Sequence, residues 1–288
     1  MKLKQIKPAI ATYIRESRAL LNKSAIPDDR AVHDVRVRMK ISRALLKLAA
    51  PQLDRAYHDR NMADLRGVGK MICSLREASV QRKTLKVLRK EYPDIFSQLH
   101  ENDVLSHLLE KKVTIAEPSD EIKAELEQID ILLNKTGYRI RFQPMNIIDP
   151  QTLLKELEFT FIRVTDIYLS CRNNPKPKTM HKFRKKAKDF LYQLYIFRSL
   201  NPAVIKVLEK KLDSMTQNLG KFNDLDQTIK ALGYSYKAAS NPPVMDELIV
   251  KIREKQDRYL SKVWPLAYQI FCPGQKLVNV LGFKLLII

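Results

Sequence analysis

The chain has 288 residues, of which 45% are hydrophobic, so it can supply the core of one large domain or two ordinary ones. Its 52 lysines and arginines against 32 aspartates and glutamates give a formal net charge of +20, which favours an anionic partner such as nucleic acid, an anionic membrane or a phosphate polymer. The three cysteines lie far apart without a CxxC pair, which excludes the common zinc and redox motifs.

The two ends of the sequence lack the pattern of a secretory signal or a membrane span. The N-terminus predicts an amphipathic helix with Leu3, Ile6, Ile10 and Ile14 on one side. The apolar tail, residues 273–288, is shorter than the roughly 20 residues that a membrane span needs. We therefore expect a docked or poorly ordered tail and a reducing, cytoplasmic setting.

The prolines divide the chain into helical blocks and predict an all-α protein, because 14 prolines but only 7 glycines occur and most prolines stand between periodic stretches. One helix is expected from Asp28-Asp29 to about Leu48, and another from Lys178-Thr179 to about Leu200. Each start has acidic or hydroxyl residues suited to a cap.

These two helices resemble each other and predict an internal duplication. The first reads VHDVRVRMKISRALL from Val32 and the second MHKFRKKAKDFLYQL from Met180, each with His, Arg three positions later and Lys seven positions after the His. They lie about half the chain apart, which suits a duplicated half-protein better than a solenoid. We expect two pseudo-symmetric antiparallel helical bundles, from repeats at about 1–117 and 150–272 connected by residues 118–149.

Each of the two helices carries a row of basic residues beside its apolar face. On a helix with about 100° per residue, the basic residues of the first helix fall within an arc of roughly 80°. The predicted binding residues are His33, Arg36, Lys40, Arg43 and Lys47 in the first helix and His181, Arg184, Lys185 and Lys188 in the second. We call them the first and second basic stripes.

Phosphate suits these stripes, because arginine offers a rigid fork, lysine a point charge, and histidine a donor that becomes cationic beside a polyanion. A basic stripe on a single helix is usually a solvated face, and a histidine is often a packing residue. The recurrence of the stripe in both halves favours a binding groove.

The sequence offers little for catalysis, and we expect neither a metal nor a cofactor. Glu77, Asp224 and Asp226 are too few for a catalytic or metal set and are better explained as caps or ion-pair partners. Gly67-Val68-Gly69-Lys70 differs from a phosphate loop, since the flanks look helical and Met71 stands where Ser or Thr would bind magnesium.

The paired His-x-x-Arg helices, followed by GKMICSLREASV from Gly69 and GKFNDLDQTI from Gly220, resemble the conserved histidine α-helical domain (CHAD) family over roughly residues 1–272. The resemblance implies two four-helix bundles around a basic central cavity that binds inorganic polyphosphate without catalysis, in some members at polyphosphate granules. It covers the stripe positions except Lys47 and Lys185, which come from helix geometry alone.

The chain also departs from the family pattern. Ile41, Asp189 and Leu191 stand where bases are usual, which predicts weaker binding. Two other functions stay open: a nonspecific nucleic-acid-binding protein, and a phosphohydrolase or phosphotransferase that uses His33 or His181.

Overall fold

The computed structural model describes residues 6–23, 27–74, 77–99, 120–142, 149–236 and 242–283. Within these ranges the chain forms 11 α-helices, a short 3-10 helix and no strand. The all-α prediction is therefore confirmed. Prolines mark helix starts, because their fixed φ suits the first helical position. The helices that begin at a proline are α5, α8, α9, α10 and α11.

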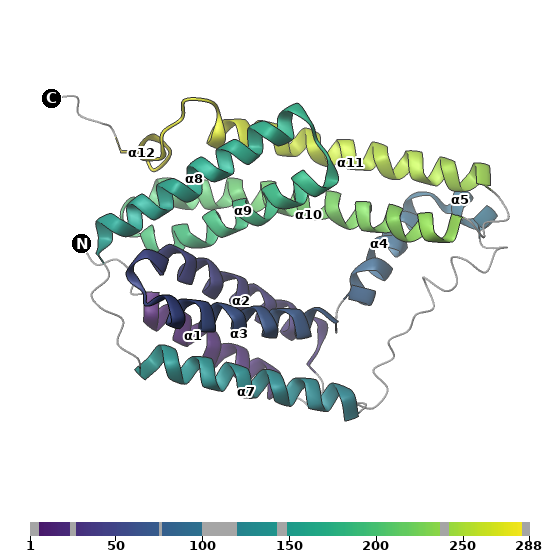
Figure 1. Cartoon of the computed structure of the whole chain (residues 1–288). Helices are drawn as coiled ribbons and strands as arrows, with labels where there is room; N and C mark the ends of the chain where they lie inside the picture. Colours follow the sequence, from purple (N-terminus) through teal and green to yellow (C-terminus); the bar gives the residue numbers. More distant parts are fainter. Residues whose placement is uncertain are drawn as a thin grey trace.

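Four of the described helices form the N-terminal bundle, and their arrangement can be followed in Figure 1. They are α1 (Ile6–Leu21), α2 (Asp29–Ala49), α3 (Arg55–Ser74) and α7 (Asp120–Phe142). Helix α1 packs against α2 and α7, and α3 packs against the same two helices. The amphipathic first helix is confirmed at Ile6, Ile10 and Ile14, which are buried, whereas Leu3 lies outside the described residues. Helix α7 occupies most of the stretch 118–149 that was expected to connect the repeats.

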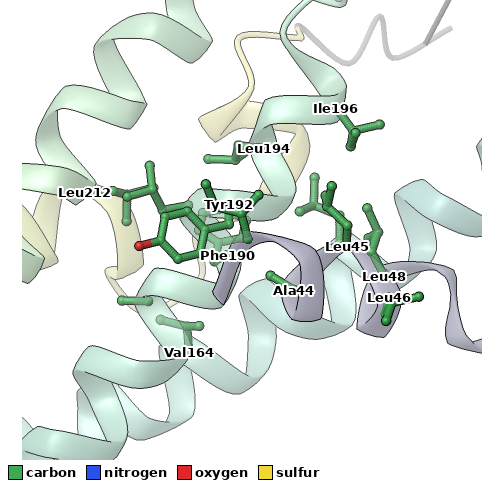
Figure 2. Packing of buried hydrophobic residues seen from close by; sticks show 14 of the residues in the cluster. Ala44, Leu45, Leu46, Leu48, Val164, Phe190, Tyr192, Leu194, Ile196 and Leu212 are labelled. Atoms are coloured by element: carbon green, nitrogen blue, oxygen red, sulfur yellow. The ribbon is translucent and has the colours of Figure 1, made fainter. Parts of the chain in front are cut away.

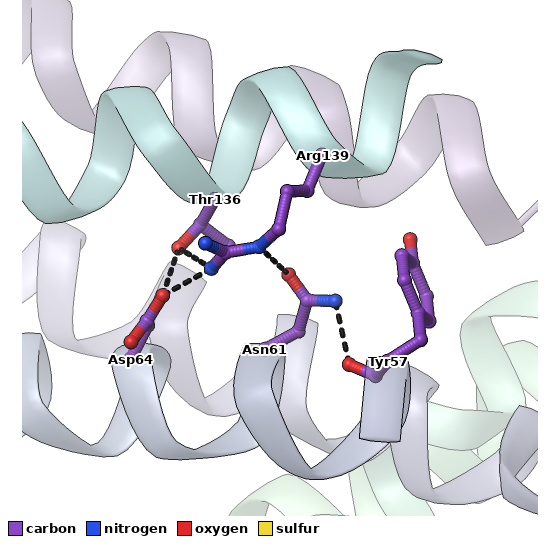
Figure 3. Close-up of polar contacts among 5 residues, drawn as sticks. All are labelled: Tyr57, Asn61, Asp64, Thr136 and Arg139. Carbon is purple, nitrogen blue, oxygen red and sulfur yellow. Dashed lines mark hydrogen bonds and ion pairs between the residues drawn. The ribbon is translucent and has the colours of Figure 1, made fainter. Parts of the chain in front are cut away.

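A polar network holds α3 to α7 inside this bundle (Figure 3). Arg139 of α7 forms an ion pair with Asp64 of α3, and its Nε donates to Asn61 Oδ1 over 3.3 Å. Thr136 Oγ1 donates to Asp64 over 3.2 Å, and Asn61 Nδ2 donates to the Tyr57 carbonyl over 2.8 Å. Asn61 and Thr136 are buried, so these bonds offset the cost of removing their polar atoms from water.

The C-terminal bundle is built from α8 (Pro150–Asn173), α9 (Pro177–Phe197), α10 (Pro202–Tyr236) and α11 (Pro242–Phe271). Its centre is aromatic: the ring centroid of Phe271 lies 5.6 Å from that of Phe161, 6.2 Å from Phe183 and 6.1 Å from Phe190. The described part of the tail includes α12 (Leu277–Val280) and is docked, since Leu277 and Leu281 are buried.

Helices α4 (Glu77–Glu91) and α5 (Pro93–Leu99) come from the first half of the sequence but pack against the second half. Helix α4 lies against α10, and α5 lies against α11. Together they form a second apolar core at the far end of the C-terminal bundle (Figure 1). Its buried members include Leu85, Leu88, Phe96, Leu232 and Leu248.

The two bundles share one continuous hydrophobic core, because α2 packs directly against α9. Figure 2 shows this core, with α2 contributing Ala44, Leu45, Leu46 and Leu48, and α9 contributing Phe190, Tyr192, Leu194 and Ile196. Gln193 of α9 is 2% exposed, and its Nε2 donates to the Ala44 carbonyl over 3.2 Å. The position of α9 relative to α2 is therefore fixed by packing and by a buried hydrogen bond.

Candidate anion-binding site

The first basic stripe lies on α2, which begins where the sequence predicted. Asp28 caps the helix, and its side chain accepts a 2.6 Å hydrogen bond from the Ala31 amide. The predicted packing face is buried at each of its members, namely Val32, Val35, Met39, Leu46 and Ala49. Packing on that side leaves His33 exposed and the other four stripe residues half-buried at the edge of the core.

The second basic stripe lies on α9, whose start differs slightly from the prediction. The helix begins at Pro177, and no side chain caps it, so Thr179 is not the cap. Its apolar face is buried as predicted, at Phe183, Phe190, Leu194 and Phe197. On the other side, His181 and Lys185 are exposed, while Arg184 and Lys188 are half-buried.

His181 is the point where charges from both stripes meet. Its pKa is lowered by partial burial first and then by the neighbouring cations Lys185, Arg184 and Lys40, while a hydrogen bond that the imidazole donates to Asn223 opposes the shift. Lys40 belongs to α2, Arg184 and Lys185 to α9, and Asn223 to α10. Two helices therefore bring three cations near one imidazole, and a third helix supplies the amide that bonds to it.

Arg184 is held in a narrow space beside α10. Its Nε donates to the Thr216 carbonyl over 3.2 Å. A Cβ atom at Gly220 would lie 3.1 Å from that Nε and 3.2 Å from Nη2, so any larger residue would press on the guanidinium. On the first stripe the corresponding crowding is absent, since a Cβ at Gly69 would lie 3.9 Å from Arg43 Nη1.

Two stripe residues form ion pairs with carboxylates. Lys188 Nζ lies 2.9 Å from Asp213 Oδ1 of α10. Lys47 Nζ lies 2.7 Å from Asp189 Oδ2, which joins α2 to α9. An anionic ligand would have to compete with these carboxylates for the two lysines.

The structure thus brings some of the predicted binding residues together and gives others different contacts. Lys40, Arg184 and Lys185 surround His181, whereas Lys47 belongs to the contact with Asp189. Asn223 was singled out in the sequence but was not among the predicted binding residues. Its place in the GKFNDLDQTI segment is the feature of the sequence that could have identified it as a site residue. Its bond to His181 depends on the packing of α9 on α10.

The acidic residues considered for catalysis have other surroundings. Asp226 is largely buried and pairs with Lys230, one turn away on α10, over 2.7 Å. This partner is a lysine outside the stripes. The side chain of Glu77 lies outside the described residues. Gly67 and Gly69 lie in the middle of α3, which confirms that they do not form a phosphate loop.

In the described part of the chain, no helix is long and apolar enough to cross a membrane. Among the same residues, no three His, Cys, Asp or Glu side chains are grouped as a metal site requires.

The comparisons with known proteins bear on the family of the chain. No curated protein matches the chain. The family model of the CHAD domain matches residues 5–233, a range that includes both basic stripes, the Asn223 segment and α7. Because that match covers well over half of the sequence, the chain belongs to the CHAD domain family.

Proposed function

We propose that this protein binds inorganic polyphosphate, without catalysing a reaction, through the two basic stripes of α2 and α9. The observation that carries the proposal is the cluster around His181, where Lys40 of one repeat meets Arg184 and Lys185 of the other. Membership of the CHAD family supports the same ligand.

The cost of bringing these cations together favours a multiply charged ligand. Like charges repel, and partial burial deprives them of water, so a bound polyanion relieves both effects. A linear phosphate polymer suits the arrangement, because residues three and four apart on a helix repeat about every 5–6 Å along one face. Arg184 offers a guanidinium fork that is already held by Thr216.

The stripes carry features of binding more than of catalysis. Two carboxylates that contact them, Asp189 and Asp213, hold Lys47 and Lys188 in ion pairs. His181 is bonded to an amide, Asn223, and not to a carboxylate that would orient it as a general base. Incubation with tripolyphosphate or long-chain polyphosphate and magnesium or manganese should release no phosphate. Metal-dependent release that His33→Ala abolishes would overturn this part of the proposal.

A titration with long-chain polyphosphate at two salt concentrations tests the binding. The stripe variant replaces Arg36, Lys40, Arg184 and Lys185 by glutamine. A control variant removes the same charge from exposed positions elsewhere, at Lys206, Lys210, Arg253 and Lys262. If each stripe residue contacts one phosphate, the slope of log affinity against log salt falls by up to about 4 in the stripe variant.

A selective loss in the stripe variant supports the proposal. An equal loss in both variants would mean nonspecific attraction to a net charge of +20, and the proposed site would be wrong. That charge also favours nucleic acid as an alternative ligand. Short duplex DNA that displaces polyphosphate at equal phosphate concentration would refute polyphosphate as the preferred ligand.

The same binding predicts where the protein is found in a cell. We extend the proposal to a cytoplasmic protein that associates with polyphosphate granules. A fluorescent fusion of the wild-type chain should colocalise with the granules, and the stripe variant should be diffuse. Colocalisation of both proteins would contradict recruitment through the stripes.

A further inference from the structure

Helix α9 carries a second group of basic residues on the flank away from α10. Arg184 and Lys188 face α10, where they contact Thr216 and Asp213. Lys182 and Lys186 lie one turn apart on a different face of α9, roughly 100° or more around the helix from those two residues. Neither of these two lysines was among the predicted binding residues.

The neighbours of Lys186 come from three helices. Lys186 is half-buried, and burial lowers its pKa most; Asp189 opposes this effect, and the cations Lys47, Arg163 and Lys182 add to it. Arg163 extends from α8, and Lys47 from α2. We call Lys47, Arg163, Lys182 and Lys186 the α8–α9 cluster.

The carboxylate that offsets this charge is already engaged. Asp189 accepts the 2.7 Å bond from Lys47, and its side chain is 19% exposed. Among the described residues, Asp189 is the carboxylate that opposes the three cations around Lys186, so positive charge exceeds negative charge around this lysine at the junction of α2, α8 and α9. A purely structural ion-pair network would bring the charges closer to balance.

We propose that the α8–α9 cluster is a second anion-binding surface, which takes phosphates of the same long polyphosphate chain that occupies the stripes. This inference rests on the proposed function, because it extends that site around α9. Lys47 connects the two surfaces, since it belongs to the first basic stripe and also contacts α9 at Asp189.

The geometry makes the second surface selective for chain length. With its side chains a helix is about 10–12 Å in diameter, so a ligand must follow a large part of that circumference to pass from Arg184 and Lys188, which face α10, to Lys182 and Lys186. Long-chain polyphosphate can do so, whereas tripolyphosphate is too short. The cluster should therefore strengthen the binding of long chains only.

The test compares Lys182→Gln/Lys186→Gln with Lys206→Gln/Lys210→Gln, a charge-matched pair of lysines that are also four residues apart on a helix. Each variant of the full chain is titrated with long-chain polyphosphate and with tripolyphosphate. For the first pair we expect the long-chain dissociation constant to rise about tenfold and the salt slope to fall by about 2, with tripolyphosphate unaffected. For the control pair we expect less than a twofold change.

A thermal unfolding measurement keeps the test independent of folding defects. Because Lys186 is partly desolvated among cations, its removal should leave the melting temperature unchanged or raised without ligand. Long-chain polyphosphate should then raise the melting temperature less in the variant than in the wild type.

The outcomes separate the two proposals. Wild-type affinity for long chains in Lys182→Gln/Lys186→Gln, together with loss in the stripe variant, would refute the second surface and leave the proposed function standing. Equal weakening of long chains and tripolyphosphate would also refute it, because the cluster would then belong to one compact site. Loss of tight binding in neither variant would overturn both proposals.

Discussion

Gly220→Ala should separate the stability of the fold from the binding of polyphosphate. The new Cβ would lie 3.1 Å from Arg184 Nε and 3.2 Å from Nη2, so the guanidinium must move by a few tenths of an ångström. Alanine gains about 1 kcal/mol over glycine in a helix interior. Weakening of the Arg184 bond to the Thr216 carbonyl costs about 1 kcal/mol. The two effects nearly cancel, and the free energy of unfolding should stay close to that of the wild type.

The affinity for polyphosphate has no such compensation, because the displaced Arg184 guanidinium loses the orientation that its bond to the Thr216 carbonyl provides. We expect long-chain polyphosphate to bind several-fold more weakly to Gly220→Ala. The matched control is Gly69→Ala, where the Cβ would lie at an ordinary 3.9 Å from Arg43 Nη1. That variant should gain about 1 kcal/mol of stability and keep its affinity.

Urea unfolding and a polyphosphate titration of the three proteins measure both quantities. If Gly220→Ala were as stable as Gly69→Ala and bound polyphosphate as tightly as the wild type, the close contact between α10 and Arg184 would have no functional meaning.

Four further predictions concern stability and the pH dependence of unfolding and binding. The pKa of His181 in the folded protein lies below the ordinary value of about 6.5, so as the pH falls below that value the imidazole is protonated first in the unfolded chain, and stability is lost. His181→Gln should remove this part of the pH dependence of urea unfolding. An unchanged dependence of the free energy of unfolding on pH would contradict this prediction. A bound polyanion that raises the pKa of His181 should bind more tightly as the pH falls from the pKa of the complex to the lower pKa of the free protein. Polyphosphate titrations at several pH values should show this effect in the wild type and not in His181→Gln. Gln193→Leu should be neutral or stabilising by about 1 kcal/mol in urea unfolding, because Gln193 Oε1 is buried without a hydrogen-bond partner; a loss above about 2 kcal/mol would show that its bond to Ala44 outweighs that cost. Phe271→Ala should lower the free energy of unfolding by about 3–5 kcal/mol, because Phe271 contacts the rings of α8 and α9, and a small loss would mean that the cavity collapses.

The local structure of the two stripe helices followed directly from the sequence. Asp28 marked the start of α2, and the apolar spacing marked the buried faces, including Val35 and Phe183. These features depend on residues within a few turns of one another, so a single sequence contains the information. The all-α class followed from the prolines for the same reason.

What the sequence could not provide were contacts between distant residues. The pairing of Lys47 with Asp189 depends on how α2 meets α9, and the bond of Asn223 to His181 depends on how α10 packs. The sequence interpretation treated Asp189 as a missing base, whereas the structure shows it as an ion-pair partner. Lys186 appeared to be an ordinary charged position, because its burial comes from helices elsewhere in the chain.

The placement of α4 and α5 on α10 and α11 makes the two halves of the duplication unable to exist apart. A fragment limited to the C-terminal half would expose the apolar side chains that cover Leu85, Leu88 and Phe96, and a fragment limited to the first half would expose those three residues. Either fragment would be prone to aggregate or to exchange helices with a second copy. Each half of the chain therefore supplies part of the core of the other, and loss of either half would remove part of that core.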